Sequence, residues 1–216
     1  MDTKLVIIME ELTALPKVAI KQSGSNHHPP DYRKNVALLD GSQATIRPLL
    51  CEERDAIVKF YARLSEDTRF LRYHYHKGEL TDADIKTFCD LDYRNVLALV
   101  AEKELDGHKA IIGVGRYIRI PPDHTAEVAL VVQDNEQQKG IGTQLLRHLA
   151  ILASQRDIQH FIGEILRENG RMLSIFRKAD PGMGQEVDSP STCVVNLSVA
   201  EIVNSMALDF DMDTSL

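Results

Sequence analysis

The chain is poor in cysteine and has no long apolar run. Three cysteines occur in 216 residues (Cys51, Cys89 and Cys193), and their odd number and wide spacing match no metal-ligand pattern. We therefore expect reduced thiols in a cytoplasmic protein, and no metal site. The apolar run inside residues 4–11 is too short for a signal peptide or a membrane span, so no membrane partner is expected.

An excess of positive charge is also missing. Lysine and arginine number 25 against 32 aspartates and glutamates, which gives a formal net charge of −7. Because nucleic-acid binding needs a basic face, we expect no nucleic-acid partner. An acidic surface keeps a protein soluble and could also attract basic protein segments or amines. The length suits one domain with a full core.

Two common phosphate-binding signatures are absent. The chain contains no Gly-x-x-x-x-Gly-Lys-Ser/Thr run, which a Walker loop requires. After the glycines of residues 140–142, a dinucleotide-binding fingerprint would need glycine or alanine at position 145, which is Leu145. Binding of ATP or a dinucleotide is therefore only a weakened alternative.

The chain does contain a Gln-x-x-Gly-x-Gly turn, made by Gln137, Gly140 and Gly142. An apolar strand-like run precedes this turn, and an amphipathic helix with leucines at helical spacing follows it. Glycines let the backbone approach a ligand closely, and the first N–H groups of a helix lack intrahelical partners. The pattern predicts a cradle for a phosphate-bearing ligand, and hence a ligand-binding enzyme.

Hydrophobic periodicity predicts an α/β (α+β) domain. From residue 35 the expected order is strand, helices, three strands, helix, strand, helix and strand. The expected strands after the first helices are 96–101 and 110–120, which form a hairpin across 104–107, then 125–132, 159–166 and 194–199. Because a helix separates them, 159–166 should run parallel to 125–132 across a right-handed crossover.

Composition divides the chain into three parts. Residues 1–34 are expected to be an N-terminal extension and linker, since Ser, Gly, His and Pro cluster at 23–30. Residues 35–200 form the predicted domain. Residues 201–216 are expected to be an acidic C-terminal tail, and its segment 209–213 is expected to be mobile.

The glycine turn and several other segments resemble those of the GNAT N-acetyltransferase superfamily. The matching segments, in chain order between about residues 30 and 180, are 40–48, 52–60, 64–73, 91–93, 98–101, 163–169 and 172–173. In that order they are most similar to the acetyltransferase module of bacterial Pat-type protein lysine acetyltransferases. The resemblance implies a GNAT fold, with a mixed, mainly antiparallel sheet flanked by helices and a splayed strand pair that forms an acyl-CoA cleft.

The resemblance also implies the ligands. The acyl donor would be acetyl-CoA, and the acceptor a primary amine, with a protein lysine as the best candidate. A small amine or an amino acid remains open as the acceptor, and so does a non-catalytic acyl-CoA sensor that keeps the fold without turnover. A homodimer is a further possibility.

Cofactor contacts are implied along two stretches, 130–132 and 137–143, and at one separate residue. Backbone groups of Leu130, Val131 and Val132 would bind the pantetheine arm and polarise the thioester carbonyl. The pyrophosphate would bind the turn of Gln137, Gln138, Lys139, Gly140, Ile141, Gly142 and Thr143. Asn169 either contacts pantetheine or caps the helix that follows.

Two carboxylates are candidates for the catalytic base. An amine nucleophile must be neutral, yet a free lysine has a pKa of about 10.4, so a base must remove its proton. Glu127 matches the position of the catalytic glutamate in Pat-type enzymes, and Glu164 on the next strand is the second candidate. The alternative for Glu127 is an ordinary cross-strand glutamate on the sheet surface.

Three features depart from the family pattern or invite another interpretation. Phe176 stands where many GNAT enzymes have a tyrosine that protonates the leaving thiolate, so the chain lacks that acid. The segment 178–184 differs from the Lys-Leu-Gly-Phe of many relatives, which puts the wall of the acceptor site in doubt. His74 and His76 lack a third metal ligand, so we expect them to line the core or the acceptor site.

Overall fold

The computed structural model describes residues 31–121 and 124–212, with side chains to residue 205. The helices are α2 (Arg54–Ala62), α3 (Glu66–Tyr73), α4 (Asp82–Cys89), α5 (Ile141–Ser154), α6 (Gly170–Ala179) and α7 (Val199–Met212), with a short 3₁₀ helix η1 (Asp134–Glu136). The strands are β1 (Lys34–Ala37), β2 (Gln43–Pro48), β3 (Val96–Leu105), β4 (His108–Ile120), β5 (Thr125–Val132), β6 (His160–Leu166), β7 (Gly184–Val187) and β8 (Thr192–Ser198).

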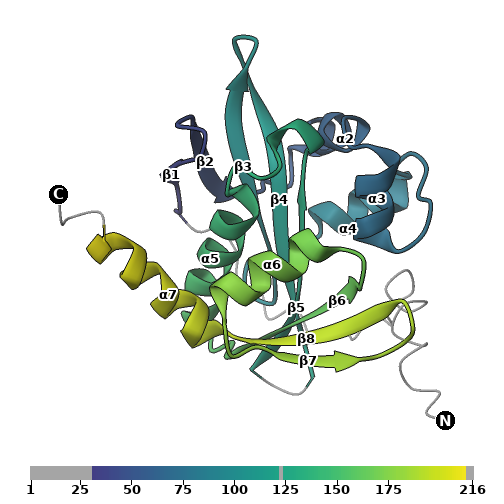
Figure 1. Ribbon diagram of the computed structural model, residues 1–216. Coiled ribbons are helices and arrows are strands. Elements are labelled where there is room, and N and C mark those ends of the chain that lie inside the picture. Colours follow the sequence, from purple (N-terminus) through teal and green to yellow (C-terminus); the bar gives the residue numbers. More distant parts are fainter. Residues whose placement is uncertain (1–30, 122–123, 213–216) are drawn as a thin grey trace.

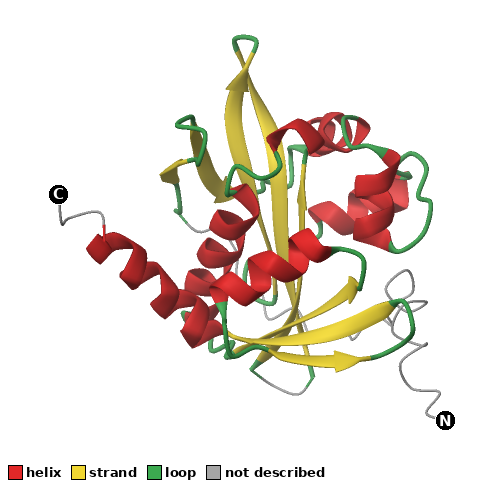
Figure 2. Ribbon diagram, in the orientation of Figure 1, coloured by secondary structure: helices red, strands yellow, loops and turns green. Residues whose placement is uncertain are grey.

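The strands form one mixed sheet that helices cover on both faces. The strand order is β1-β2-β3-β4-β5-β6-β8-β7, and every neighbouring pair is antiparallel except β5 and β6. Helices α5, α6 and α7 lie over one face, and α2, α3 and α4 gather beside the other (Figures 1 and 2). This arrangement confirms the predicted fold class, a mainly antiparallel sheet flanked by helices.

The predicted meander is present. Strands β3 and β4 form a hairpin that is longer than predicted, because Leu105 pairs with His108 across Asp106 and Gly107. Both turn residues have left-handed φ angles of 51° and 77°, which suits a two-residue hairpin turn. Strand β5 has the predicted bounds, and β6 runs parallel to it after helix α5, as predicted.

Strands β5 and β6 separate soon after they begin. Their pairing runs from Thr125 and His160 to Glu127 and Ile162, and no pair follows. Strand β5 continues to Val132 and β6 to Leu166, so both have unpaired edges beyond the last pair. This is the splayed strand pair that the family resemblance implies.

Two elements differ from the expectations at the C-terminal side. The C-terminal tail expected over 201–216 is helical as far as Met212, because α7 extends to that residue, and this includes most of the segment expected to be mobile at 209–213. Val199 and Ile202 are buried in the main core and Val203 packs against it, so one face of α7 contacts the hydrophobic core. Strand β7, which pairs with β8 at the edge of the sheet, is not predicted.

At the N-terminal side, β1 starts at Lys34 and pairs with β2, so the first strand straddles the expected boundary at residues 34 and 35. The predicted extension at 1–30 and the last residues of the expected tail, 213–216, lie outside the described residues. Within the described part of the chain, no helix combines the length and the apolar character needed to cross a membrane.

Helix α5 packs closely on the sheet because β4 has glycines beneath it. A Cβ added at Gly115 would lie 2.9 Å from Leu130 Cδ2, 3.0 Å from Leu149 Cδ1 and 3.3 Å from Leu145 Cβ. At Gly113 it would lie 3.0 Å from Ile141 Cγ2. These small residues hold the start of α5, and the turn that precedes it, against the sheet.

We predict that Gly115→Ala lowers the free energy of unfolding by roughly 1–3 kcal/mol, because the added methyl group overpacks the interface between α5 and the sheet. Gly78→Ala is the matched control, since a Cβ there meets nothing within 4 Å. Urea denaturation of both variants checks the prediction. Equal stability of the two variants would contradict the close packing described here.

Candidate active site

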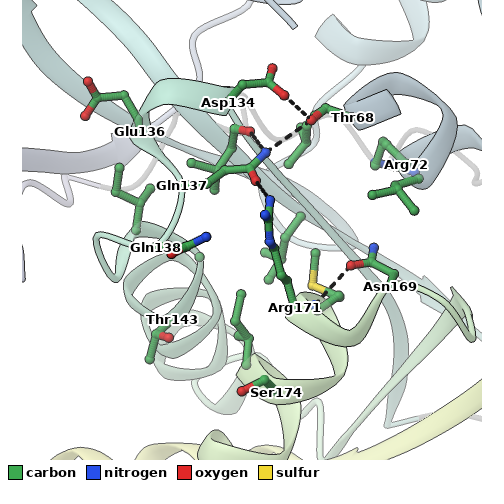
Figure 3. Close-up of a pocket in the computed structure, with 18 of the residues that line it drawn as sticks. Thr68, Arg72, Asp134, Glu136, Gln137, Gln138, Thr143, Asn169, Arg171 and Ser174 are labelled. Carbon is green, nitrogen blue, oxygen red and sulfur yellow. Dashed lines mark hydrogen bonds between the residues drawn. The ribbon is translucent and has the colours of Figure 1, made fainter. Parts of the chain in front are cut away.

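A cavity of about 770 Å³ lies beside the end of β5 (Figure 3). Its walls come from α3, the end of β5, the turn before α5, and helix α6 with the loop that precedes it. Of the predicted cofactor residues, all but Lys139 line it: Leu130, Val131, Val132, Gln137, Gln138, Gly140, Ile141, Gly142, Thr143 and Asn169. The structure thus brings almost the whole predicted set to one cavity.

The turn before α5 presents free backbone N–H groups to this cavity. Gln138 and Gly140 have left-handed φ angles of 64° and 88°, and no side chain caps the helix at Gly140. Among the described residues, the N–H groups of residues 138–143 have no hydrogen-bond acceptor; the first one paired is that of Gln144, which donates to Gly140 O. Such a row of N–H groups at a helix N-terminus suits an anion.

A hydrogen-bond network joins this turn to α3. Gln137 Nε2 donates to Thr68 Oγ1 and to Val132 O, both at 3.1 Å. Thr68 Oγ1 donates to Asp134 Oδ1 at 2.6 Å, and Asp134 also accepts from the backbone N–H and the hydroxyl of Ser65. The first glutamine of the turn is therefore held in place by a helix more than sixty residues earlier in the chain (Figure 3).

Lys139 faces away from the cavity. Its Nζ lies 3.1 Å from Glu136 Oε2 and 3.3 Å from Asp40 Oδ2. The hydrogen bond that Lys139 Nζ donates to Glu136 is the main reason why the pKa of Lys139 is raised. The charge of Lys139 is thus neutralised by two carboxylates, and the structure does not bring this predicted residue to the cavity.

A second cavity, of about 400 Å³, meets the first. Five residues line both cavities: Leu71, Arg72, Leu130, Asn169 and Met172. Four consecutive residues of β5, 127–130, line the second cavity although their side chains alternate between the sheet faces. This is possible because β6 no longer covers the edge of β5 beyond Glu127. The second cavity therefore reaches into the gap between the separating strands.

Both predicted catalytic carboxylates lie in this second cavity. Glu127 of β5 pairs in register with Ile162, and Glu164 follows two residues later on β6, so the two glutamates share a sheet face. His74, Tyr73 and Tyr75 at the end of α3 line the same cavity.

Comparison with known proteins identifies the family. Residues 57–179, more than half of the chain, match the acetyltransferase (GNAT) family. The chain belongs to the GNAT acetyltransferase family. The GNAT domain of PAT from S. lividans is similar in structure, with a TM-score of 0.71 and 28% identity over 79% of this chain and 99% of that domain. The predicted Pat-type GNAT resemblance is therefore confirmed.

Two further proteins are similar to this chain, one in sequence and one in fold. Acetyltransferase PA5475 from Pseudomonas aeruginosa is 33% identical over 117 residues, which are 54% of this chain and 63% of that protein. The matched region thus spans less than two thirds of the relative's length. The putative acetyltransferase yncA from Salmonella typhimurium, solved with its cofactor acetyl-CoA, has the same fold at a TM-score of 0.55 and 18% identity, covering 73% of this chain and 95% of that one.

In this GNAT chain, burial and nearby charges act on Glu127 in opposite directions. Burial raises the pKa of Glu127 above its ordinary value, and the guanidinium groups of Arg72 and Arg116 offset part of that increase. Burial also lowers the pKa of Arg116 to about 10, and its Nε lacks a hydrogen-bond partner in the described structure. A carboxylate whose pKa is raised toward neutrality suits a general base.

Glu164 lies in a different electrostatic setting. Burial raises its pKa, and the negative charges of Asp188 and Glu127 raise it further. His74 Nδ1 approaches Glu164 Oε1 to 3.8 Å, but burial and the charge of Arg72 lower the pKa of His74. We therefore regard this contact as one between a neutral imidazole and a carboxyl group, and not as an ion pair. No cation offsets the raised pKa of Glu164 as the two arginines do for Glu127.

The structure also shows the surroundings of Asn169 and Phe176 and bears on the question of a metal site. Asn169 caps α6, because its Oδ1 accepts a hydrogen bond from Met172 N at 3.1 Å, and it also lines both cavities. Phe176 is buried against Gly163 and lines the second cavity, where it offers no hydroxyl. In the described residues, no group of three or more His, Cys, Asp or Glu side chains is placed to hold a metal ion.

Several residues that line the larger cavity are absent from the sequence prediction, among them Thr68, Arg72, Asp134 and Arg171. Arg171 Nη1 donates to Gln137 Oε1 at 2.7 Å, so α6 also contacts the glycine turn (Figure 3). A signal for Arg171 does exist in the sequence, because Arg171, Ser174 and Lys178 recur at helical spacing. The contacts of Thr68 and Asp134 cross more than sixty residues and leave no local pattern.

We predict that Asp134→Ala lowers the free energy of unfolding by about 1–2 kcal/mol, because three donors of α3 and its cap lose their acceptor. Glu66→Ala, at an exposed first-turn position of the same helix, should have a smaller effect. Urea denaturation measures both. The network would be unimportant for stability if the two variants behaved alike.

Proposed function

We propose that this chain transfers an acetyl group from acetyl-CoA to a primary amine, and that the acceptor is a protein lysine. The observation that carries the proposal is the meeting of two cavities where β5 and β6 separate. One has free N–H groups that suit phosphate, and the other holds a partly buried carboxylate, Glu127. Family membership, the acetyl-CoA of the Salmonella protein and the similarity to the S. lividans PAT domain support it.

In this proposal acetyl-CoA occupies the larger cavity. Its pyrophosphate accepts hydrogen bonds from the N–H groups of residues 138–143, and the positive end of the α5 dipole favours its charge. The pantetheine arm follows the unpaired edge of β5 along Leu130, Val131 and Val132. The thioester then lies at the junction of the cavities, beside Asn169 and Met172.

The amine enters through the smaller cavity. Glu127 accepts a proton from the ammonium, directly or through a water molecule, and the neutral nitrogen attacks the thioester carbonyl carbon. Backbone N–H groups of β5 stabilise the oxyanion that forms. When the tetrahedral intermediate collapses, the C–S bond breaks, CoA leaves as a thiolate, and the nitrogen releases its second proton to water to give the neutral amide. A thiol of pKa about 8.5 is an adequate leaving group, so Phe176 in place of an acid does not prevent transfer.

The wall of the smaller cavity supports a lysine acceptor. The ammonium of Lys77, a residue of this wall, lies 5.2 Å and 5.6 Å from the ring centroids of Tyr73 and Tyr75 and 2.7 Å from Asp84 Oδ1. Aromatic faces attract ammonium groups in this way. The smaller cavity, whose wall also contains Glu127 and Glu164, therefore already accommodates one alkylammonium group.

We predict that Glu127→Gln lowers kcat for acetyl transfer to a lysine peptide by about 10²–10⁴-fold, while the affinity for acetyl-CoA is kept, because only the base is removed. Transfer rates and calorimetric titration measure the two quantities. Glu104→Gln, at an exposed position near the β3–β4 turn, is the control. If Glu164→Gln alone abolished transfer, Glu164 would be the base. A wild-type chain that bound acetyl-CoA but acetylated no amine would be a sensor.

The charge of Arg72 gives a second, independent prediction. Because Arg72 lowers the pKa of Glu127, Arg72→Ala should raise it, and more of Glu127 would be protonated at any given acidic pH. The acidic limb of the kcat/KM profile should therefore move to higher pH. Arg69→Ala, one turn earlier on α3 and outside both cavities, should leave the limb in place. If the acidic limb of Arg72→Ala did not move, Arg72 would have no influence on the pKa of the catalytic base.

A further inference from the structure

Two arginine side chains line the smaller cavity without a carboxylate partner. They are Arg72 of α3 and Arg116 of β4. The guanidinium carbon of Arg72 lies 5.1 Å from the ring centroid of Tyr73, and no ion pair of Arg72 occurs within the described residues. Arg116 Nη1 donates to Thr87 O at 2.9 Å, but its Nε has no hydrogen-bond partner, and in the described part of the chain it likewise pairs with no carboxylate. Holding a partly buried charge without a counter-ion is costly, so an anion bound beside these groups would stabilise them.

Both arginines act on Glu127, the proposed base. Arg116 pairs in register with Ala129, and Glu127 lies two residues before Ala129 on β5, so the side chains of Arg116 and Glu127 share a sheet face. Diagonal neighbours of this kind are roughly 7–8 Å apart. Burial raises the pKa of Glu127, and the charges of Arg72 and Arg116 lower it, although neither guanidinium forms an ion pair with it in the described structure. An amine delivered to Glu127 therefore arrives near both cations.

The described wall of the smaller cavity offers little negative charge to these arginines. Its lining includes three cations (Arg72, Lys77 and Arg116) and three carboxyl groups (Asp84, Glu127 and Glu164). Lys77 and Asp84 neutralise each other, because Nζ lies 2.7 Å from Oδ1. Burial and the negative charges of Asp188 and Glu127 raise the pKa of Glu164, which favours its neutral form. Glu127 becomes neutral once it has taken the proton of the amine. The positive charge of the two arginines is then in excess.

The two guanidinium groups are positioned before any ligand binds. Arg72 lies over the ring of Tyr73, and Arg116 is held by the carbonyl of Thr87 on α4. Burial, and after it the charge of Arg72, lowers the pKa of Arg116 to about 10, so Arg116 is still a cation at neutral pH. A guanidinium presents its N–H groups in a fixed planar fork that matches the two oxygens of a carboxylate. One carboxylate would relieve the repulsion between both cations.

We propose that Arg72 and Arg116 bind a carboxylate of the acceptor, so that the preferred acceptor is a protein lysine with an aspartate or glutamate within two residues of it. The lysine amine meets Glu127, and the acidic neighbour meets the arginines. The same charges repel a lysine that has basic neighbours, so the site selects by repulsion as well as by attraction. The inference deepens the proposed function and rests on it, because it takes a lysine side chain as the acceptor.

The test compares kcat/KM for acetylation of peptides that contain a single lysine, with either aspartate or asparagine at one of the positions −2, −1, +1 and +2. A further pair of acceptors, Nα-acetyl-lysine and its amide, differs only in a free α-carboxylate. For the wild-type chain we expect the aspartate peptide to be preferred about 5–10-fold at one or more positions, as suits a carboxylate paired with partly exposed guanidinium groups.

Three variants and a control locate the preference. Arg72→Gln and Arg116→Gln should each reduce it to less than about 2-fold, whereas Arg116→Lys, which keeps the charge, should retain part of it. Arg69→Gln is the control, since Arg69 is on α3 but outside both cavities, and it should keep the full preference. Each ratio compares two acceptors on the same variant, so a general loss of stability or a shifted pKa of Glu127 cancels.

Several results would overturn the inference. They are equal kcat/KM for aspartate and asparagine at every position, or a preference that persists in both glutamine variants. A preference confined to Nα-acetyl-lysine over its amide, and lost in those variants, would support the carboxylate site but show that it takes a free α-carboxylate and not an acidic neighbour. If the wild-type chain acetylated no lysine acceptor, the proposed function would fail and the inference with it, whereas equal rates would leave that function intact.

Discussion

The separation of β5 from β6 is the constraint on which the site depends. The strands pair for only three residues each, up to Glu127 and Ile162, and they are unpaired beyond that point. The gap leaves backbone groups of β5 free for a ligand and lets the two cavities meet. It also brings Glu127 beside the junction, at the last residue pair before the strands part. If β5 and β6 paired along their whole length, the edge of β5 would be covered and the two cavities would not meet.

The pKa values of Asp134 in the larger cavity and of the two glutamates in the smaller cavity are shifted in opposite directions. In the larger one, hydrogen bonds offset the effect of burial on Asp134 and hold its pKa low, so this carboxylate serves as an anchor for α3 and the glycine turn. In the smaller one, burial raises the pKa values of Glu127 and Glu164, and only Glu127 has arginines that offset the change. The larger cavity therefore has an ionised carboxylate held by hydrogen bonds, whereas the smaller cavity contains carboxyl groups able to exchange protons.

Local sequence patterns predict most of the fold and the position of the glycine turn, but not the long-range contacts that complete the site. The alternation in 125–132 gives β5 its bounds, and the spacing of Gln137, Gly140 and Gly142 locates the turn, because both depend on neighbouring residues. Long-range contacts are not predictable in this way. The hydrogen bond from Gln137 to Thr68, the ion pair of Lys139 with Asp40 and the docking of α7 each join parts of the chain that carry no shared pattern. Those contacts decide which side chains face the cavity.

The most direct test of the account is a calorimetric titration of the wild-type chain with acetyl-CoA, with ATP and NAD as controls. The account predicts saturable binding of one acetyl-CoA per chain and no comparable heat from the other two ligands, because in the proposed complex the unpaired edge of β5 binds a pantetheine arm, which ATP and NAD lack. An absence of binding at millimolar acetyl-CoA, or equal binding of ATP, would contradict it.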